Sequence, residues 1–207
     1  MSGAPEDPSV SRVPHDFDAM YVDSTPPPWD IGRPQAEFRR LAEADGLIGP
    51  VLDVGCGTGE HALLAAAHGH VAVGVDFAPS AIALARAKAA ARGLDVRFAV
   101  GDALELEALG GRFETVLDCG LFHTFEDADR PRFEASLAAV VVPGGRYHLL
   151  CFSEHQPGDW GPRRVTQDEI RRCFKERWEV MAIDASLIEI TIDPAGAQAW
   201  HAELLRH

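Results

Sequence analysis

The chain has 207 residues, of which 46% are hydrophobic, and its formal net charge is −13. This length and composition suit one compact domain with its own core, and so acidic a surface argues against nucleic acid as a partner. No apolar run approaches the ~20 residues of a membrane span, which argues against a membrane as well.

The N-terminal part divides into a tail and a lid. Residues 1–14 are polar and rich in proline and serine, as disordered tails are, and they contain no signal peptide. Residues 15–46 mix large aromatic rings with a three-proline run and end in an amphipathic stretch at helical spacing. We therefore expect an ordered lid followed by a helix. Residues 47–207 would form a single domain, in the cytoplasm by default.

From residue 51 onward, short apolar runs alternate with helical patterns. The expected strands are 51–55, 71–76, 96–100, 113–120 and 146–152, and the expected helices are 60–68, 79–92 and 129–141. The strands are continuously apolar, which is typical of a parallel sheet covered by helices on both faces. Right-handed crossovers between such strands predict an α/β fold with a doubly wound sheet.

The alternation weakens after the fifth strand. A polar loop and a helix over residues 166–177 precede two strand-like runs, 178–184 and 187–193. The two residues between these runs, Ala185 and Ser186, indicate an antiparallel hairpin at the edge of the sheet. A short helix over 197–207 would end the chain.

Residues 51–60 read V-L-D-V-G-C-G-T-G-E, so three glycines follow a buried strand. In open α/β sheets, ligands bind at the carboxyl ends of the strands where the strand order reverses, and this loop lies at that point. Gly55, Gly57 and Gly59 would let backbone approach a ligand, beside the first amides of the next helix. Glu60 replaces the last glycine of the dinucleotide fingerprint G-x-G-x-x-G, so a smaller anion such as an amino-acid carboxylate fits better.

Two acidic residues follow the neighbouring strands. Asp76 ends the second strand, where a carboxylate can accept hydrogen bonds from both hydroxyls of a ribose. Asp102 follows the third strand, where it can accept one from an adenine amino group. Each residue could instead act locally, Asp76 as a helix cap and Asp102 in a turn. Together with the glycine loop, the two acids favour a nucleoside ligand.

Five motifs occur in order between residues 48 and 152: V-L-D-V-G-C-G-T-G, V-G-V-D-F, G-D-A, L-D-C-G and P-G-G. They resemble the motifs of class I S-adenosylmethionine-dependent methyltransferases. The resemblance implies a seven-stranded, mostly parallel, Rossmann-like sheet in the order 3-2-1-4-5-7-6, and S-adenosyl-L-methionine as the cofactor. The cofactor-binding residues that it implies are Tyr21, Trp29, Asp53, Gly55, Gly57, Gly59, Asp76, Phe77, Asp102, Ala103, Asp118 and Cys119.

Within that set, the resemblance gives particular roles to three residues. Asp53 would support the methionine amine, and Asp118 with Cys119 would line the floor near the sulfonium. Magnesium-dependent catechol methyltransferases need a carboxylate cluster after the fourth strand, where this chain has cysteine and glycine. We therefore expect no metal, and the pair His68 and His70 lies in a turn away from this edge.

The segment P-P-W-D-I-G-R-P-Q at residues 27–35 is similar to the P-W-D-x-G-R segment of thiol, thiocyanate and halide methyltransferases and their thiopurine-methylating relatives. The similarity extends to actinobacterial members that methylate heterocyclic toxins such as hydroxyquinolones, in which an N-terminal segment folds over the cofactor. Phe17, Tyr21 and Trp29 stand where plant-type enzymes carry three tryptophans. Two of the three differ here, which leaves room for a flat aromatic acceptor.

Methyl transfer from a sulfonium is an in-line displacement, so the enzyme mainly aligns the acceptor and excludes water. A neutral hydroxyl must also lose a proton. His123 is the candidate base, because an imidazole pKa lies near ~6.5, although it could instead pack or cap. An acidic acceptor such as an N-hydroxyquinolone needs no base. The residues expected to bind the acceptor are Phe17, Phe122, His123, His155 and Trp160.

The sequence therefore predicts an enzyme that transfers a methyl group to the O or N atom of a small hydroxylated heteroaromatic, in a detoxification reaction. The alternative acceptor is a thiol, thiocyanate or halide. A further alternative is a non-catalytic cofactor-binding module, and an NAD-dependent oxidoreductase is disfavoured by Glu60. We expect a monomer or homodimer whose partner is the small-molecule substrate.

Overall fold

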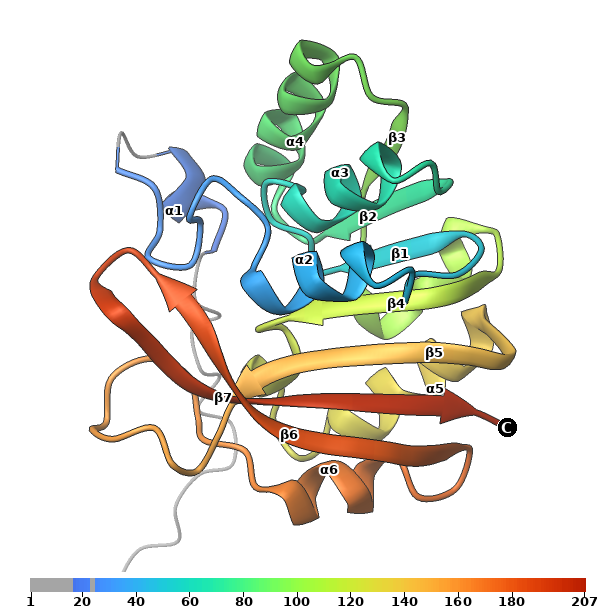
Figure 1. Cartoon of the computed structure of the whole chain (residues 1–207), viewed down its shortest axis with the longest axis vertical. Coiled ribbons are helices and arrows are strands. Elements are labelled where there is room, and N and C mark those ends of the chain that lie inside the picture. Colours follow the sequence, from blue (N-terminus) through green and yellow to red (C-terminus); the bar gives the residue numbers. More distant parts are fainter. Residues whose placement is uncertain (1–16, 23–24) are drawn as a thin grey trace, which may run out of the picture.

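The computed structural model describes residues 17–22 and 25–207 as one seven-stranded sheet with helices on both faces (Figure 1). The strand order is β3-β2-β1-β4-β5-β7-β6, which confirms the order expected from the resemblance. The strands are β1 (Val51–Val54), β2 (Ala72–Asp76), β3 (Val96–Val100), β4 (Phe113–Cys119), β5 (Val141–Phe152), β6 (Trp178–Ile190) and β7 (Asp193–Arg206). β1 to β5 are parallel, and β7 is antiparallel to both β5 and β6.

The helices follow the predicted alternation with the strands. They are α1 (Ala19–Val22), α2 (Ala36–Glu43), α3 (Glu60–Ala67), α4 (Pro79–Arg92), α5 (Arg130–Val140) and α6 (Gln167–Cys173), with short 3₁₀ helices over Ala103–Leu109 and Phe122–Thr124. None of the helices among the described residues is long and apolar enough to cross a membrane. The predicted tail over residues 1–14 lies outside the described residues.

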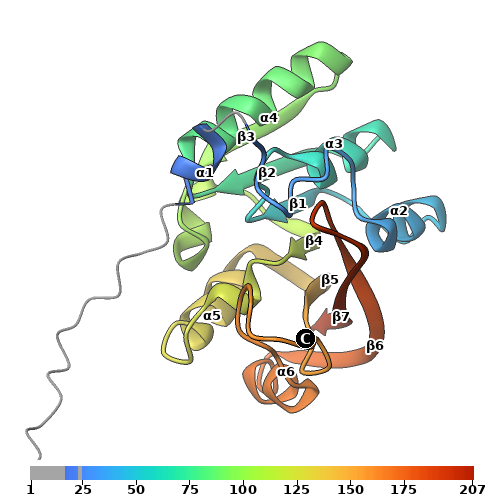
Figure 2. The ribbon, with the colours of Figure 1, turned by 90° about the vertical axis from the view of Figure 1, so that its left-hand side faces the viewer.

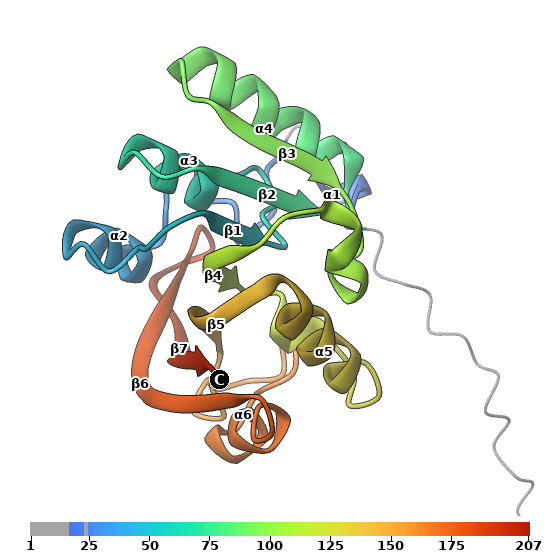
Figure 3. The same ribbon diagram turned by 90° about the vertical axis from the view of Figure 1, so that its right-hand side faces the viewer.

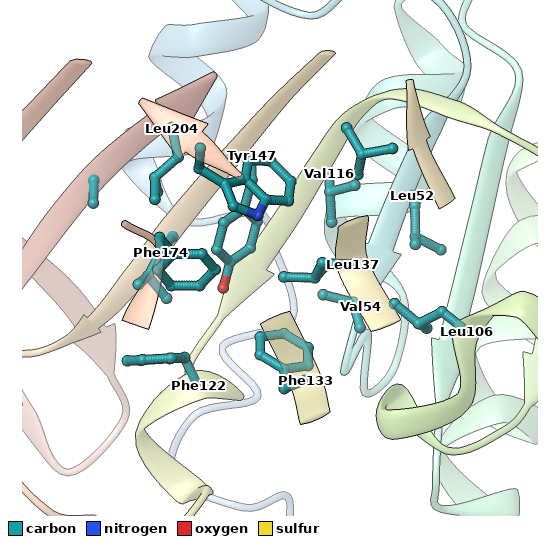
Figure 4. Packing of buried hydrophobic residues seen from close by; sticks show 14 of the residues in the cluster. Leu52, Val54, Leu106, Val116, Phe122, Phe133, Leu137, Tyr147, Phe174 and Leu204 are labelled. Carbon is teal, nitrogen blue, oxygen red and sulfur yellow. The ribbon is translucent and has the colours of Figure 1, made fainter. Parts of the chain in front are cut away.

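Each face of the sheet has its own apolar cluster. Phe38, Leu63 and Ile82 are buried beneath α2, α3 and α4 on one face. On the other face, Phe133 and Phe174 pack with further aromatic rings beneath α5 and α6 (Figure 4). Both faces are therefore covered, as the continuously apolar strands predicted.

The C-terminal hairpin differs from the prediction. β6 runs unbroken through Ala185 and Ser186, and β7 stands where a final helix was expected. The turn instead follows Ile190, which pairs with Asp193. Ala197 and Ala199 are buried in the cluster beneath α2, α3 and α4, and Trp200, Ala202 and Leu204 are buried in the opposite cluster, so pairing with β5 and β6 places this segment in the core of the sheet. This tertiary demand overrides the helical propensity of the Ala- and Leu-rich segment.

Asp118 is directed into the core, and not toward the edge of the sheet where ligands bind. Its side chain is 0% exposed. The Tyr147 hydroxyl donates to its Oδ2 at 2.8 Å, and the amide of Leu121 donates to its Oδ1 at 2.9 Å. Burial raises the pKa of this carboxyl to about 7. Asp118 therefore holds the loop after β4 in place, and its expected contact with the cofactor is not supported.

We predict that Asp118→Asn removes a pH-dependent part of the stability. Between pH 3.8 and about 7 the folded chain keeps a proton on this carboxyl that the unfolded chain has lost. The free energy of unfolding therefore falls as the pH rises through this range, by up to ~4 kcal/mol. Asparagine still accepts from the Leu121 amide but does not titrate. In urea unfolding at pH 4 and pH 7, the variant should lose less stability than the wild type, whereas exposed Asp159→Asn should match the wild type. Equal losses for both variants would contradict the assignment.

Candidate functional site

The carboxyl ends of the parallel strands lie at the left-hand edge in Figure 1, which faces the viewer in Figure 2. α1, the loop over residues 153–165 and the β6–β7 turn gather at the same edge. Figure 3 shows the opposite edge, where the chain enters the parallel strands. The predicted site residues after β1, β2, β3, β4 and β5 are thus brought to one side of the molecule.

Asp76 connects the loops after β1 and β2. Its Oδ2 accepts a hydrogen bond from the amide of Gly57 at 2.7 Å, and its Oδ1 accepts one from the amide of Ala78 at 2.8 Å. Burial raises the pKa of this carboxyl, and the nearby charge of Asp53 adds to the effect. Each carboxylate oxygen has further lone-pair capacity, so Asp76 can still accept from the hydroxyls of a ribose.

The three glycines of the loop have positive φ angles of +66° at Gly55, +50° at Gly57 and +85° at Gly59. A Cβ atom at Gly55 would lie 2.9 Å from the Cβ of Leu121, and one at Gly59 would lie 2.6 Å from the Phe98 ring. These two glycines therefore permit close packing within the protein. At Gly57 the nearest atom is the Tyr21 hydroxyl, 3.0 Å away. Only the middle glycine faces the N-terminal segment.

Asp53 carries a buried carboxylate oxygen that lacks a partner. The residue is 1% exposed, and its Oδ2 accepts from the amide of Ala62 at 3.0 Å. Its Oδ1 has no hydrogen bond, and the His61 Nδ1 atom lies 3.8 Å away. Leaving such an oxygen unpaired in the interior is costly. A cationic ligand with N–H donors would satisfy it, so the residues present fit a ligand that carries an amino group.

The N-terminal segment, residues 17–22 and 25–35, lies over the glycine loop. The Trp29 Nε1 donates to the Tyr21 hydroxyl at 2.9 Å. The ring of Phe17 meets that of Trp29 edge-on, with centroids 6.0 Å apart. Burial raises the pKa of Tyr21 above its usual value. The three aromatic residues expected in the lid thus form one group beside Gly57.

Two carboxylates fix this N-terminal segment to α4 and to the glycine loop. Asp18 accepts from the amide of Ser80, in the first turn of α4, at 2.7 Å. Asp30 accepts from the Thr58 hydroxyl at 3.0 Å. The segment therefore contacts both α4 and the glycine loop. Asp30 belongs to the P-W-D-x-G-R segment noted in the sequence, whereas no sequence pattern had singled out Asp18.

The same segment is also fixed to the end of β6. Arg33 makes two hydrogen bonds to the Glu189 carboxylate, both of 2.9 Å. The Gln35 side chain pairs with the backbone of Glu189 through bonds of 3.0 and 2.7 Å. Because such bidentate contacts fix orientation as well as distance, the segment is held on two sides.

His123 does not have the geometry of a general base. It is 6% exposed, and its Nδ1 accepts a hydrogen bond from the amide of Phe152 at 3.0 Å. The proton of the neutral ring therefore lies on Nε2. Burial lowers the pKa of His123 to about 3, and the charges of Arg164 and Arg130 add to this effect. A base with so low a pKa takes up a proton poorly at neutral pH. The structure favours a hydrogen-bond donor at this position.

A pair of aromatic rings lies next to His123. The ring of Phe152, at the end of β5, meets the His123 ring edge-on at 5.0 Å and the Trp160 ring at 5.7 Å. We call Phe152 and Trp160 the ring pair. Trp160 is 39% exposed, so part of its surface is free to contact a ligand. Planar ligands pack well against such rings.

Phe122, expected to bind the acceptor, is instead a core residue. It is 0% exposed and packs against Phe133 and Phe174, with the guanidinium of Arg130 4.6 Å from its ring centroid. The 3₁₀ helix after β4 turns its side chain inward, which the sequence did not indicate. His155 is exposed and lines a pocket of about 410 Å³ with residues of the β6–β7 hairpin. Its role in binding the acceptor stays a prediction.

The residues expected at the adenine end are accessible. Phe77 is 68% exposed, and Asp102 is exposed while its Oδ1 accepts from the amide of Leu104 at 2.8 Å. Ala103, expected beside the adenine with Asp102, and Cys119, expected near the sulfonium, are both half-buried. Among residues 17–22 and 25–207, no group of three or more His, Cys, Asp or Glu side chains is placed to hold a metal ion.

Comparisons with known proteins show the family to which the chain belongs. The family model of a methyltransferase domain matches residues 51–145. The 2-heptyl-1-hydroxyquinolin-4(1H)-one methyltransferase of Mycobacteroides abscessus is 39% identical over 173 residues, which cover 79% of this chain and 76% of the relative.

Two solved structures share the fold. One, described as "Conversion of a Disulfide Bond into a Thioacetal Group during Echinomycin Biosynthesis", has a TM-score of 0.82 at 38% identity and covers 92% of this chain and 91% of its own. The other, the glycopeptide N-methyltransferase MtfA complexed with sinefungin, has a TM-score of 0.69 at 20% identity and covers 83% of this chain and 86% of its own. The chain therefore belongs to the class I S-adenosylmethionine-dependent methyltransferases and is similar, within them, to the actinobacterial methyltransferases of heterocycles.

Proposed function

We propose that the chain transfers the methyl group of S-adenosylmethionine to the O or N atom of a small hydroxylated heteroaromatic, such as a hydroxyquinolone, in a detoxification reaction. The observation that carries the proposal is the ring pair beside His123 at the ends of β4 and β5. Phe152 is buried and supports Trp160, so a flat acceptor can pack on the exposed part of the Trp160 ring. The Mycobacteroides relative is a 2-heptyl-1-hydroxyquinolin-4(1H)-one methyltransferase, which supports the same class of acceptor.

S-adenosylmethionine, the cofactor of this family, supplies an activated methyl group on a positively charged sulfur. In this proposal the unpaired oxygen of Asp53 accepts from the cofactor's amino group. The loop around Gly57 holds the amino-acid part, and Asp76 accepts from the ribose hydroxyls. Phe77, Asp102 and Ala103 hold the adenine, and Tyr21 and Trp29 cover the loop.

On the acceptor side, His123 keeps its proton on Nε2 and so donates a hydrogen bond to the reacting oxygen. The acceptor's own proton leaves to solvent before the transfer, because His123, with a pKa of about 3, is too weak a base to take it at neutral pH. In the displacement, the bond from oxygen to the methyl carbon forms as the bond from that carbon to sulfur breaks. This chemistry suits acceptors whose hydroxyl is acidic.

A sulfur acceptor is the second candidate. The solved structure with a TM-score of 0.82 is described by a reaction at a disulfide bond, and its sequence is 38% identical to this chain. That similarity supports a thiol as the alternative acceptor. Membership of the methyltransferases favours an enzyme over the non-catalytic module.

We predict methyl transfer to hydroxyquinolones in a panel that also contains flavonols, simple thiols and iodide. The measurement is the appearance of labelled methyl groups in the product, with boiled protein as the control. We expect the hydroxyquinolones to react fastest because they combine a flat ring with an acidic hydroxyl. Turnover of thiols alone would overturn the proposed acceptor class and support the sulfur alternative.

The role of His123 has its own test, the pH dependence of kcat/KM with two hydroxyquinolones of different acidity. The rising limb should follow the pKa of each acceptor, because the pKa of His123 lies far below, at about 3. His123→Asn places an acceptor near the Phe152 amide but removes the Nε2 proton. Because the hydrogen bond stabilises the bound anion, whose charge is lost in the transfer, we expect the KM of the acceptor to rise roughly tenfold while the position of the rising limb stays the same. A limb near pH ~6.5 that disappears in the variant would show that His123 is a base after all.

A further inference from the structure

The loop over residues 153–165 is built around the guanidinium of Arg164. An arginine side chain has five N–H groups in a fixed planar fork. Here they face five backbone carbonyl oxygens of the same loop. The acceptors are Gln156 at 3.1 Å from Nε, Trp160 at 2.9 Å and Pro162 at 2.6 Å from Nη1, and Pro157 at 3.3 Å and Gly158 at 3.0 Å from Nη2.

The same guanidinium lies against the ring pair. Its central carbon is 5.4 Å from the ring centroid of Phe152 and 5.8 Å from that of Trp160. Both distances are within the range of a cation–π interaction. Arg164 therefore fixes the backbone of the loop and the two rings together.

Close packing brings this loop to the end of β5. Gly161 has a φ of +76°, and a Cβ atom there would lie 3.3 Å from the ring of Phe152. The amide of Phe152 in turn donates to His123. Contacts thus run without a break from Arg164 through the ring pair to the side chain after β4.

We infer that Arg164 is a positioning residue that presents Trp160 to the methyl acceptor. This inference rests on the proposed function, since it takes the exposed part of Trp160 as the acceptor's surface. Arg164 does not touch the acceptor in this account. Without the five hydrogen bonds, a loop with glycines at 158 and 161 would have to be ordered each time an acceptor binds, and that ordering weakens binding.

The test compares Arg164→Lys and Arg164→Met with the wild type, using a hydroxyquinolone as the acceptor. Lysine keeps the charge but offers three donors on a compact ammonium, so it cannot satisfy five carbonyls. We expect the KM of the acceptor to rise roughly tenfold in both variants, with kcat changed less than about threefold. The Kd of S-adenosylhomocysteine should stay unchanged in calorimetry. Arg171→Lys, an exposed arginine on the neighbouring helix α6, is the matched control and should leave KM unchanged.

A double-mutant cycle with Trp160→Ala shows whether the effect passes through Trp160. The KM of Arg164→Met with Trp160→Ala should equal that of Trp160→Ala alone. Additive effects on KM, or a wild-type KM in Arg164→Met, would overturn the inference.

Hydrogen exchange of the amides from 156 to 164 supplies a readout that does not need turnover. Exchange should be faster in Arg164→Lys than in the wild type, and equal rates would also overturn the inference. If the wild type methylates no heterocycle, the proposed function fails, while the exchange result still decides whether Arg164 orders the loop.

Discussion

One carboxylate oxygen at the centre of the sheet determines much of this site. Asp53 Oδ1 is buried and without a hydrogen-bond partner. Two further carboxyl groups, the half-buried Asp76 and the buried Asp118, lie at or next to the ends of β2 and β4. Like charges this close disfavour one another's ionised form, which is part of the reason that the pKa of Asp76 is raised. A ligand that brings positive charge and N–H donors relieves this unfavourable arrangement. The methyl donor of the family carries both an ammonium and a sulfonium group.

The acceptor side has the opposite electrostatic character. Burial and the positive charges of Arg164 and Arg130 keep His123 neutral, and its remaining N–H points away from the Phe152 amide. We propose that a site with carboxylates on the donor side and arginines behind the acceptor side favours a cationic donor and an anionic acceptor. Methyl transfer removes the positive charge from the donor's sulfur and the negative charge from the acceptor. The products are therefore held less strongly by the charges of the site than the reactants were. In this proposal an acceptor that binds as an anion needs no strong base in the protein.

The sequence predicted the part of the fold that depends on local patterns. The glycine loop, the continuous apolar strands and the acids at the carboxyl ends of β2 and β3 follow from residue type and spacing. The motif resemblance supplied the strand order. The hairpin was wrong because the Ala- and Leu-rich stretch from residue 197 has the composition of a helix, whereas its pairing with β5 and β6 makes it a strand.

The errors in the site have a different origin. Side-chain direction after β4 is set by one 3₁₀ helix, which turns Phe122 inward while Asp118 accepts hydrogen bonds from Tyr147 and the following loop. Neither direction is encoded in a short motif. The contacts of Glu189 with Arg33 join segments more than one hundred and fifty positions apart, and no local signal marks them. No sequence pattern marks Arg164 either, because its five backbone acceptors come together only in the folded loop.

The central claim is that the unpaired Oδ1 atom of Asp53 accepts a hydrogen bond from the amino group of the cofactor. Calorimetric titration of S-adenosylmethionine into Asp53→Asn tests it most directly, with Asp118→Asn as a matched buried control whose oxygens are already engaged. The account predicts that Asp53→Asn weakens binding at least tenfold, as expected for the loss of a charge-assisted hydrogen bond worth about 1.5–3 kcal/mol, while Asp118→Asn binds like the wild type. Wild-type affinity in a folded Asp53→Asn variant would contradict it.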